Sequence, residues 1–411
     1  MISKSDIMPR PRSLQPDVLN IANKTRANLL FWRGQFSPQL IEALLQAYVQ
    51  PNDYVLDPFV GSGTVLLESG RAGIRAVGVE INPAAAKLAQ IYELINCRTP
   101  ERHEILATID NQLSKVLSAT IPIDFVTAKG NLNHDFTQHI LEIHGGIHDR
   151  LARIVFETFI ILLDFHNHPT NHLYVSHSWK KLKNIVYNLP YSKKDISLIL
   201  SDARTVPLPP NSVDFVITSP PYINVFNYHQ QYRASVEALG WKPLVIAQSE
   251  IGSNRKFRSN RFLTIVQYCL DMCDVLTELC RVSKNSCHLI FILGRESNVK
   301  KTSFKNGILF TELATKCANF RCILNQQRVF RNRFGTLIYE DIIHLARDGP
   351  SKNNRLENPR AVAKRVLEAA LNHSPNESKG DLRSAIGSID LVQPSPRFNL
   401  NQAGKHTMRS K

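Results

Sequence analysis

The sequence lacks the features that mark membrane-spanning and secreted proteins. It has no window of about 18 uninterrupted apolar residues, which a membrane-spanning helix requires. Its first residues, MISKSDIMPRPRSLQP, lack the apolar segment of a secretory signal. We therefore expect a cytosolic protein. The 411 residues, 43% of them hydrophobic, suffice for one large domain with insertions or for two smaller domains.

Cysteine is scarce and poorly placed for cross-links or metal binding. The seven cysteines are an odd number, and no pair has the spacing of a zinc knuckle, which favours reduced thiols. Cys269 and Cys273 are one helical turn apart, but their apolar surroundings favour core packing. Four histidines share one stretch in which no cysteine or acid has the spacing that completes a ligand set, so we expect no metal: His134, His139, His144 and His148.

Acidic residues are outnumbered by basic ones. The chain has 35 Asp and Glu against 50 Lys and Arg, which gives a net charge of +15. Such an excess favours a polyanionic partner, nucleic acid above all. Charge alone leaves open a basic protein without such a partner.

Strand and helix patterns alternate along most of the chain. Residues 36–49 place Ser37 before Pro38 and carry apolar residues on one face, which predicts a helix capped by Ser37. A strand at 53–59, a glycine-rich turn, an apolar helix closed by Gly70 or Gly73 and a second strand follow. The second strand is at 74–81, further strands are predicted at 196–200, 213–219, 288–294 and as a pair within 327–346, and further helices at 82–95, 262–282 and 309–320. This alternation predicts a doubly wound α/β sheet without internal repeats.

Two regions do not fit the alternation. Residues 97–194 are far longer than an ordinary connection and contain helical patterns, so we expect an inserted helical subdomain. Beyond about Arg347 the composition turns polar, with one possible helix at 359–371, and we expect a partly disordered or loosely docked tail. The predicted organisation is an arm (1–25), the first half of the sheet (26–96), the insertion (97–194), the second half (195–346) and the tail (347–411).

Glycines and acids meet at the predicted carboxyl edge of the sheet. The stretch DPFVGSGT connects a strand to a helix, where glycines let backbone amides approach a ligand. A dinucleotide-binding turn would have a third glycine where this chain has Leu66. Glu80 ends the second strand and Asp202 follows the third, so with Asp57 there is an acid at three strand ends. The pattern predicts a ligand with a ribose but no phosphates; the alternative is a tight turn beside an incidental acid.

Two segments together resemble a known enzyme family. The run VLDPFVGSGTVLLESGRAGIRAVGVEINP and the later SDARTVPLPPNSVDFVITSPPY resemble the DNA amino-methyltransferases, which methylate cytosine N4 or adenine N6 with S-adenosylmethionine. The resemblance covers about residues 26–95 and 195–346, and neither the insertion nor the tail. It implies a Rossmann-like methyltransferase sheet, with a cofactor-binding half (26–96) before a catalytic half (195–346).

The resemblance implies roles for individual residues around the cofactor. Glu80 would hold the ribose, and Asp202 would read the adenine amino group. The segment NLLFWRGQFSPQLI is similar to the one that such enzymes fold over the methionine part. The remaining residues would surround the pocket: Phe36, Ser37, Asp57, Phe59, Gly61, Gly63 and Thr218.

The stretch DFVITSPPY would carry the chemistry. An exocyclic base amine is a poor nucleophile because its lone pair is delocalised into the ring, so the enzyme needs acceptors aimed at the amino hydrogens. The Ser219 hydroxyl and the Pro220 carbonyl are such acceptors, and Pro221 helps to fix the backbone. Tyr222 can stack on an extruded base. The alternative is a strand-terminating turn with a core tyrosine.

The kind of methylation is narrowed by two features. Ser before Pro-Pro-Tyr, here Ser219, is commoner in the cytosine-N4 enzymes, whereas Asp or Asn is commoner in the adenine enzymes, with exceptions both ways. Attack at cytosine C5 needs a cysteine that follows a proline in those enzymes, and no cysteine of this chain does. We therefore expect direct transfer to an amine, most often cytosine N4.

Basic and aromatic residues near the motif are candidates for nucleic-acid contacts. They are Asn224, Tyr228, Arg255, Lys256 and Arg258, and the insertion is a possible target-recognition region. Packing and a solvated surface are the alternatives for these residues.

Three functions remain open from the sequence. The first is a methyltransferase for double-stranded DNA, which fits the modification partner of a restriction endonuclease. The second is an RNA or protein amino-methyltransferase, because related sheets use similar Pro-Pro-Tyr strand ends. The third is a non-catalytic protein that binds S-adenosylmethionine or DNA, which the intact Ser-Pro-Pro-Tyr disfavours. The oligomeric state and the recognition sequence stay open.

Overall fold

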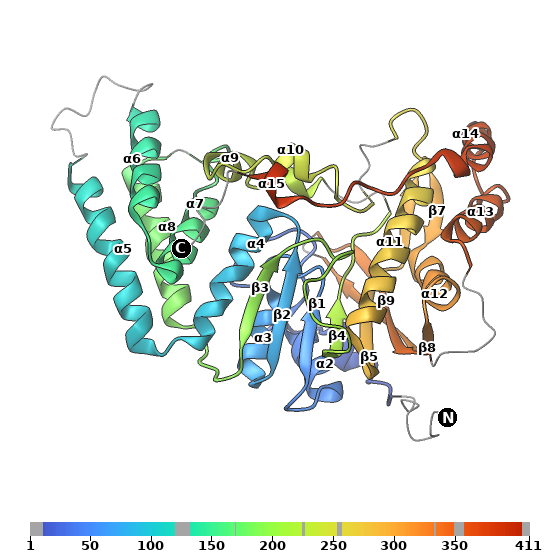
Figure 1. Ribbon diagram of the computed structural model, residues 1–411, viewed down its shortest axis with the longest axis horizontal. Coiled ribbons are helices and arrows are strands. Elements are labelled where there is room, and N and C mark those ends of the chain that lie inside the picture. The colour runs from blue at the N-terminus through green and yellow to red at the C-terminus, as the bar shows by residue number, and fades with distance from the viewer. Residues whose placement is uncertain are drawn as a thin grey trace.

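A mixed sheet of seven strands forms the centre of the protein (Figure 1). The computed structural model describes residues 11–119, 132–168, 170–223, 227–252, 257–332, 334–348 and 357–404. Within them the strand order is β3-β2-β1-β4-β5-β9-β8, with β1 to β5 parallel and β9 antiparallel to both of its neighbours. The strands are β1 (Tyr54–Asp57), β2 (Arg75–Glu80), β3 (Ile196–Leu200), β4 (Val213–Thr218), β5 (Ser283–Gly294), β8 (Phe320–Arg331) and β9 (Leu337–Arg347).

Successive side chains of each central strand enter two different apolar cores. Val55 and Phe215 face one core, while Leu56 and Val216 face the other, as the two-residue period of a strand requires. Helices α2 (Pro38–Tyr48), α3 (Thr64–Ala72) and α4 (Pro83–Gln90) cover the first face, and α11 (Leu263–Val282) and α12 (Asn306–Lys316) cover the second. The predicted doubly wound α/β fold is confirmed.

The predicted insertion consists of four helices that continue the first core. They are α5 (Thr99–Ala119), α6 (Leu132–Gly146), α7 (Arg150–Leu163) and α8 (His172–Tyr187), preceded by the 3-10 helix η2 (Ile91–Asn96). Phe156 and Phe159 lie in the same buried cluster as Ile217 of the sheet. The buried Arg102 guanidinium donates to the carbonyls of Leu94 (2.9 Å) and Pro190 (2.7 Å), and so ties the beginning of the insertion to its end.

The expectation of a loosely docked tail is wrong for residues 357–404. They form α13 (Pro359–Ala370), α14 (Asn376–Gly387), the 3-10 helix η4 (Ile389–Leu391) and α15 (Leu400–Ala403). Val362, Leu367 and Leu382 are fully buried in the second core. The polar composition misled because one apolar face is enough for a helix to pack: α13 packs against α11 and α12, and α14 packs against α13.

Other departures from the sequence prediction are local. Ser37 is the residue before α2, but its hydroxyl makes no capping bond and is buried without a partner among the described residues. A second, two-stranded sheet was not predicted: β6 (Glu296–Val299) and β7 (Thr302–Lys305). Short helices also follow the Pro-Pro-Tyr motif: the 3-10 helix η3 (Tyr228–Gln230), α9 (Arg233–Ala238) and α10 (Pro243–Ile246).

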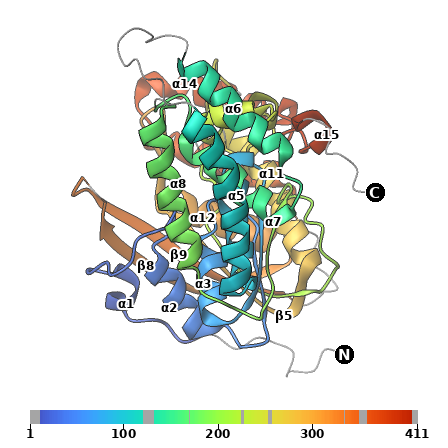
Figure 2. The same cartoon turned by 90° about the vertical axis from the view of Figure 1, so that its left-hand side faces the viewer.

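The described part of the N-terminal arm packs against the far edge of the sheet. Helix α1 (Pro16–Asn20) lies beside β8, where the Val329 N–H donates to Asn20 Oδ1 at 2.8 Å. Figure 2 shows β8 and β9 reaching out as a long hairpin next to α1. None of the helices in the described ranges has the length and apolar character to cross a bilayer.

Candidate active site

The site lies at the carboxyl edge of the sheet, between β1 and β4. The two strands are neighbours, but their crossovers run in opposite directions, to β2 and to β5, and such a switch point is where open α/β sheets bind ligands. The Thr218 hydroxyl at the end of β4 donates to Asp57 Oδ1 at the end of β1, at 2.6 Å. This buried bond holds the predicted cofactor strand and the predicted catalytic strand together.

The glycine turn allows a close approach of the backbone to neighbouring side chains. Gly61 and Gly63 have φ angles of +54° and +89°, which favour glycine. A Cβ at Gly63 would lie 2.6 Å from the Tyr92 ring and 3.0 Å from the Ala89 backbone. The turn therefore needs glycine for its packing as well as for its conformation.

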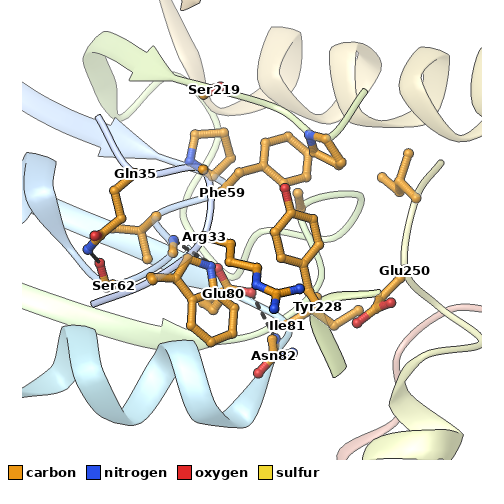
Figure 3. A pocket seen from close by; sticks show the side chains of 18 of the residues that line it. Arg33, Gln35, Phe59, Ser62, Glu80, Ile81, Asn82, Ser219, Tyr228 and Glu250 are labelled. Carbon is orange, nitrogen blue, oxygen red and sulfur yellow. Dashed lines mark hydrogen bonds between the residues drawn. The ribbon is translucent and has the colours of Figure 1, made fainter. Parts of the chain in front are cut away.

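Glu80 accepts backbone hydrogen bonds from both sides. Its Oε2 accepts the Gly61 N–H at 2.9 Å and its Oε1 accepts the Asn82 N–H at 2.8 Å (Figure 3). Each oxygen keeps capacity for one more donor, and Glu80 lines the pocket. That arrangement suits the two hydroxyls of a ribose.

The N-terminal segment closes the pocket from above the turn. Trp32 stacks on Tyr228, with ring centroids 6.1 Å apart, and Tyr232 donates to the Phe31 carbonyl at 3.1 Å. The Gln35 amide donates to the Ser62 hydroxyl inside the glycine turn. Residues 31–35 are thus fastened both to the cofactor half and to the segment after the Pro-Pro-Tyr motif.

Ser219 and Tyr222 form a hydroxyl pair at the end of β4. Ser219 Oγ lies 3.1 Å from Tyr222 Oη, and Ser219 and Pro221 line the pocket. The Tyr222 ring packs on Gly294 at the end of β5, where a Cβ would lie 3.1 Å from the ring. Burial raises the pKa of Tyr222, so its hydroxyl stays protonated and available as a donor. The geometry makes Tyr222 a support for the Ser219 hydroxyl; stacking on a base stays a prediction.

Asp202 lines the opposite side of the pocket, and its carboxylate is already engaged. Arg204 donates to it through the backbone N–H, Nε and Nη2, at 2.7 to 3.2 Å, and the Phe398 N–H donates at 3.1 Å. The hydrogen bonds and charge of Arg204 hold the pKa of Asp202 below its usual range, although burial opposes them. Its predicted contact with the adenine amino group stays a prediction.

The pocket is acidic and suits a cationic ligand. Burial raises the pKa of both Asp57 and Glu80 to about 7, and the charge of Glu80 adds to the effect on Asp57. Asp57 Oδ2 is buried and has no hydrogen-bond partner among the described residues. Glu250 contributes a further carboxylate, whose Oε2 lies 3.0 Å from His229 Nδ1 and accepts from it when that nitrogen carries the proton. A positive charge beside these groups would return their pKa values toward the usual range.

These features fit S-adenosylmethionine. Gly61 lines the pocket without a side chain, Glu80 matches a ribose, and Asp57 Oδ2, which has no partner among the described residues, matches an ammonium or sulfonium charge. Among the described residues that line the pocket, Arg33 is the only cation, so this part of the lining offers no basic cluster for phosphates.

The predicted site residues fall into three groups. Those that line the pocket are Phe36, Phe59, Gly61, Glu80, Asp202, Ser219, Pro221 and Tyr228. Those directly behind the lining or beside it in the chain are Ser37, Asp57, Gly63, Thr218, Pro220 and Tyr222. Asn224, Arg255 and Lys256 lie outside the described residues, and Arg258 is exposed.

Sequence reasoning missed several lining residues. Trp32, Arg33 and Gln35 lie within the segment that the resemblance placed over the cofactor, so that signal was present. Ser249, Glu250 and Ile251 come from a loop more than 25 residues after Ser219, and no motif marks them. Only the folded chain brings that loop to the pocket.

The first half of this site agrees with a comparison with known families. Residues 15–91 match the N6/N4 DNA methylase family model. The match begins inside the expected arm, contains β1, the glycine turn and Glu80, and ends before β4. It supports S-adenosylmethionine as the cofactor, and it does not extend to Ser219 or to the Ser-Pro-Pro-Tyr subgroup.

Individual relatives match over short segments. A type II methyltransferase of Xanthomonas campestris pv. cyanopsidis is 48% identical over 72 residues, which cover 18% of this chain and 23% of that protein. A tRNA (guanine(10)-N2)-dimethyltransferase of Methanothermobacter thermautotrophicus is 40% identical over 53 residues, 13% of this chain and 16% of that protein. The chain thus spans about a quarter or less of the length of the curated relatives that it matches.

One solved structure illustrates the wider comparison. A SAM-dependent methyltransferase from Methanosarcina mazei aligns over 74% of this chain and 97% of its own, at 13% identity and a TM-score of 0.35.

Proposed function

We propose that this protein is an S-adenosylmethionine-dependent methyltransferase that modifies an exocyclic amine of a base in double-stranded DNA. The observation that carries the proposal is the convergence of Gly61, Glu80 and Ser219 on one pocket. The first two belong to the half that matches the DNA methylase family, and the third ends the neighbouring strand. The resemblance of the serine motif favours cytosine N4, with adenine N6 as the alternative.

The chain's own residues would prepare the amine. S-adenosylmethionine supplies an electrophilic methyl group. Of the two directions open to the hydrogen bond between Ser219 and Tyr222, the one in which the Ser219 hydroxyl donates to Tyr222 Oη would leave the Ser219 lone pairs facing the amine, and the Pro220 carbonyl would offer a second acceptor. Accepting the amino hydrogens localises the nitrogen lone pair, which raises its nucleophilicity. Transfer would be direct: the amine nitrogen would take the methyl group as its bond to sulfur breaks, S-adenosylhomocysteine would be the leaving group, the proton of the amine would pass to solvent water, and no covalent bond to the protein would form.

The duplex would lie against the β8–β9 hairpin. Gly294 pairs with Glu340, so the pairs Val329–Tyr339, Phe330–Ile338 and Arg331–Leu337 extend past the carboxyl end of β5. Between Gln326 and Tyr339 the sequence has three arginines and no acid. Arg331 is exposed and Phe334 is 76% exposed at the tip. A basic, aromatic projection that is separated from the catalytic strand β4 by β5 suits the backbone and bases of DNA.

The test is transfer of labelled methyl groups from S-adenosylmethionine to unmethylated duplex DNA, followed by digestion and identification of the labelled base. We expect N4-methylcytosine. N6-methyladenine would correct the base while keeping the substrate. Label found only in RNA or protein would overturn the DNA assignment.

An RNA substrate is the second candidate, because of the match to a tRNA methyltransferase. The same assay with unmodified tRNA distinguishes it: transfer to tRNA and none to duplex DNA would establish this candidate. Where the methylated sites resist cleavage by a restriction endonuclease of the same host, a role in restriction and modification follows.

A further inference from the structure

The C-terminal segment 393–398 is fastened to the wall of the pocket through one buried arginine. The Arg204 side chain is fully buried, and its guanidinium pairs with Asp202 at 2.7 Å. The same guanidinium donates to the carbonyls of Ser395 and Pro396, each at 2.8 Å. Figure 1 shows this segment crossing above the sheet from α14 to α15, beside α10.

The segment also donates hydrogen bonds in return. The Phe398 N–H donates to Asp202 Oδ2 at 3.1 Å. The Ser395 N–H and hydroxyl donate to the two oxygens of Asp271, at 2.8 and 2.5 Å, and Asp271 is the second partner of Arg204, at 2.9 Å. One arginine, two acids and one stretch of backbone therefore form a closed network.

This network joins two separate walls of the pocket. Asp202 and Ala203 line the pocket after β3, and residues 249–251 line it from the loop that follows α10. Arg204 Nη2 also donates to the Ser249 carbonyl, at 3.3 Å. Arg204, to which the C-terminal segment is bound, thus sets the distance between the two walls.

Removing the segment would leave the network incomplete. Arg204 would lose two carbonyl acceptors, and Asp271 would lose two donors. Buried charged groups that lose hydrogen-bond partners are destabilised, and they relax by moving toward water. Because Arg204 and Asp202 move together, the wall of the pocket would move with them.

We propose that residues 393–398 are part of the cofactor site: acting through the positioning residue Arg204, they set the wall that faces the adenine end of S-adenosylmethionine. The inference rests on the proposed function. The strand order supports the orientation, because the ribose acid Glu80 ends β2, the methionine side lies toward β1 and β4, and Asp202 follows β3 on the other side.

A pair of truncations tests the proposal. One ends the chain after Val392 and removes the segment together with α15, and the matched control ends it after Phe398, which keeps the segment and removes α15 and the residues after it. The dissociation constant of S-adenosylhomocysteine is measured by calorimetry. We expect about tenfold weaker binding or more for the first truncation, from the lost charge-assisted bonds, and no change for the control.

The adenine end is tested with an analogue in which inosine replaces adenosine. A general loss of stability weakens both ligands alike, whereas a displaced wall lowers the preference for adenosine over inosine. We expect the truncation after Val392 to reduce this ratio. An unchanged affinity and an unchanged ratio in a folded truncation would overturn the proposal.

A milder variant and a protease assay cover the case in which the truncation does not fold. Ser395→Ala removes one bond to Asp271, and we expect a several-fold loss of affinity with a modest fall in thermal stability that leaves the protein folded at the assay temperature. Because coupling is reciprocal, S-adenosylhomocysteine should slow tryptic cleavage after Arg397 in the full chain. Equal cleavage with and without ligand, together with normal affinity of Ser395→Ala, would contradict the inference.

These outcomes separate the inference from the proposed function. A full-length protein that binds neither S-adenosylmethionine nor S-adenosylhomocysteine would overturn both. A protein that binds and transfers methyl groups equally well without residues 393–411 would overturn the inference alone.

Discussion

The hydroxyl groups of Ser219 and Tyr222 are 3.1 Å apart. Unless the base itself contacts Tyr222, the tyrosine hydroxyl can influence the reaction only through Ser219. Tyr222→Phe removes the hydroxyl and keeps the ring on Gly294. We expect kcat to fall about tenfold, for the loss of one hydrogen bond, with unchanged cofactor affinity. Single-turnover methylation of duplex DNA measures the effect.

The control variants decide whether the two residues act as a pair. Tyr191→Phe, at a half-exposed tyrosine after α8, should have no effect. In a double-mutant cycle, Ser219→Ala and Tyr222→Phe should be non-additive. Additive losses would show that Tyr222 contributes separately, as a stacking residue would.

The raised pKa values of Asp57 and Glu80 predict pH-dependent cofactor binding. Both carboxyls have a pKa of about 7 in the folded state without ligand, which is above the value in an unfolded chain. Their contribution to the free energy of unfolding is therefore present at low pH and is lost as the pH rises through about 7. A cationic ligand prefers the ionised acids, so its affinity should rise between about pH 6 and 8. Calorimetry in buffers of different ionisation enthalpy should also detect proton release.

Asp57→Asn isolates the first of these groups. It keeps the acceptor for Thr218 and removes the charge, so we expect weaker binding and a flatter pH profile. Asp53→Asn, at the opposite end of the same strand, is the matched control. An Asp57→Asn protein with the wild-type pH profile would contradict the assignment.

Among the elements, the β8–β9 hairpin carries a prediction about DNA. Arg331→Ala at its tip should weaken binding to all duplex sequences alike and lower the slope of log K against log salt by about 1. Arg321→Ala, at the start of the same hairpin and the opposite edge of the sheet, should change neither. Fluorescence anisotropy across salt concentrations measures both, and equal slopes for the two variants would exclude the hairpin from the interface.

Strands β5 and β9 carry a buried histidine pair that predicts acid sensitivity. His288 Nε2 lies 2.9 Å from His344 Nδ1, and burial lowers their pKa values to about 4 and about 3. The folded state therefore binds fewer protons than the unfolded state at acid pH. Above about pH 6.5 the pair does not lower the free energy of unfolding, which falls by a few kcal/mol toward pH 4.

Replacing both histidines by leucine should flatten this decline, as measured by urea unfolding at several pH values. His177→Ala, on the exposed side of α8, should leave it unchanged. Asp57 and Glu80 contribute a pH dependence of the opposite sign to the free energy of unfolding. This contribution is the same in the wild type, the double variant and His177→Ala, so it cancels when their pH profiles are compared. An unchanged decline in the double variant would place the acid sensitivity elsewhere.

For the whole molecule, the continuous first core predicts a single unfolding transition. Trp179 in the insertion and Trp32 at the pocket belong to the same buried cluster. In variants that keep only one of these tryptophans, the fluorescence midpoint in urea should coincide with the circular-dichroism midpoint. A lower midpoint for Trp179 than for the backbone signal would show that the insertion unfolds by itself.

Much of the fold and half of the site could be predicted from the sequence. The strand that ends at Asp57, the glycine turn and Glu80 are consecutive in the chain, so local spacing is enough to place them at one sheet edge. The loop at 249–251 and the segment 393–398 could not be predicted, because they reach the site by contacts between residues far apart in sequence. The partners of Arg204 show this, since one is two residues away and another 191.

What the sequence determined by itself is the chemistry available at the end of each strand. The alternating burial of strand residues, the glycine turn and the proline-terminated strand are local properties of the sequence. In any doubly wound sheet they place the ends of the parallel strands at the same edge. What only the tertiary structure decided is which of these groups are free to act. Asp57 keeps an oxygen without a partner among the described residues, while Asp202 is occupied by Arg204 and Phe398, because hydrogen-bond capacity depends on all neighbours in space and not on position along the chain.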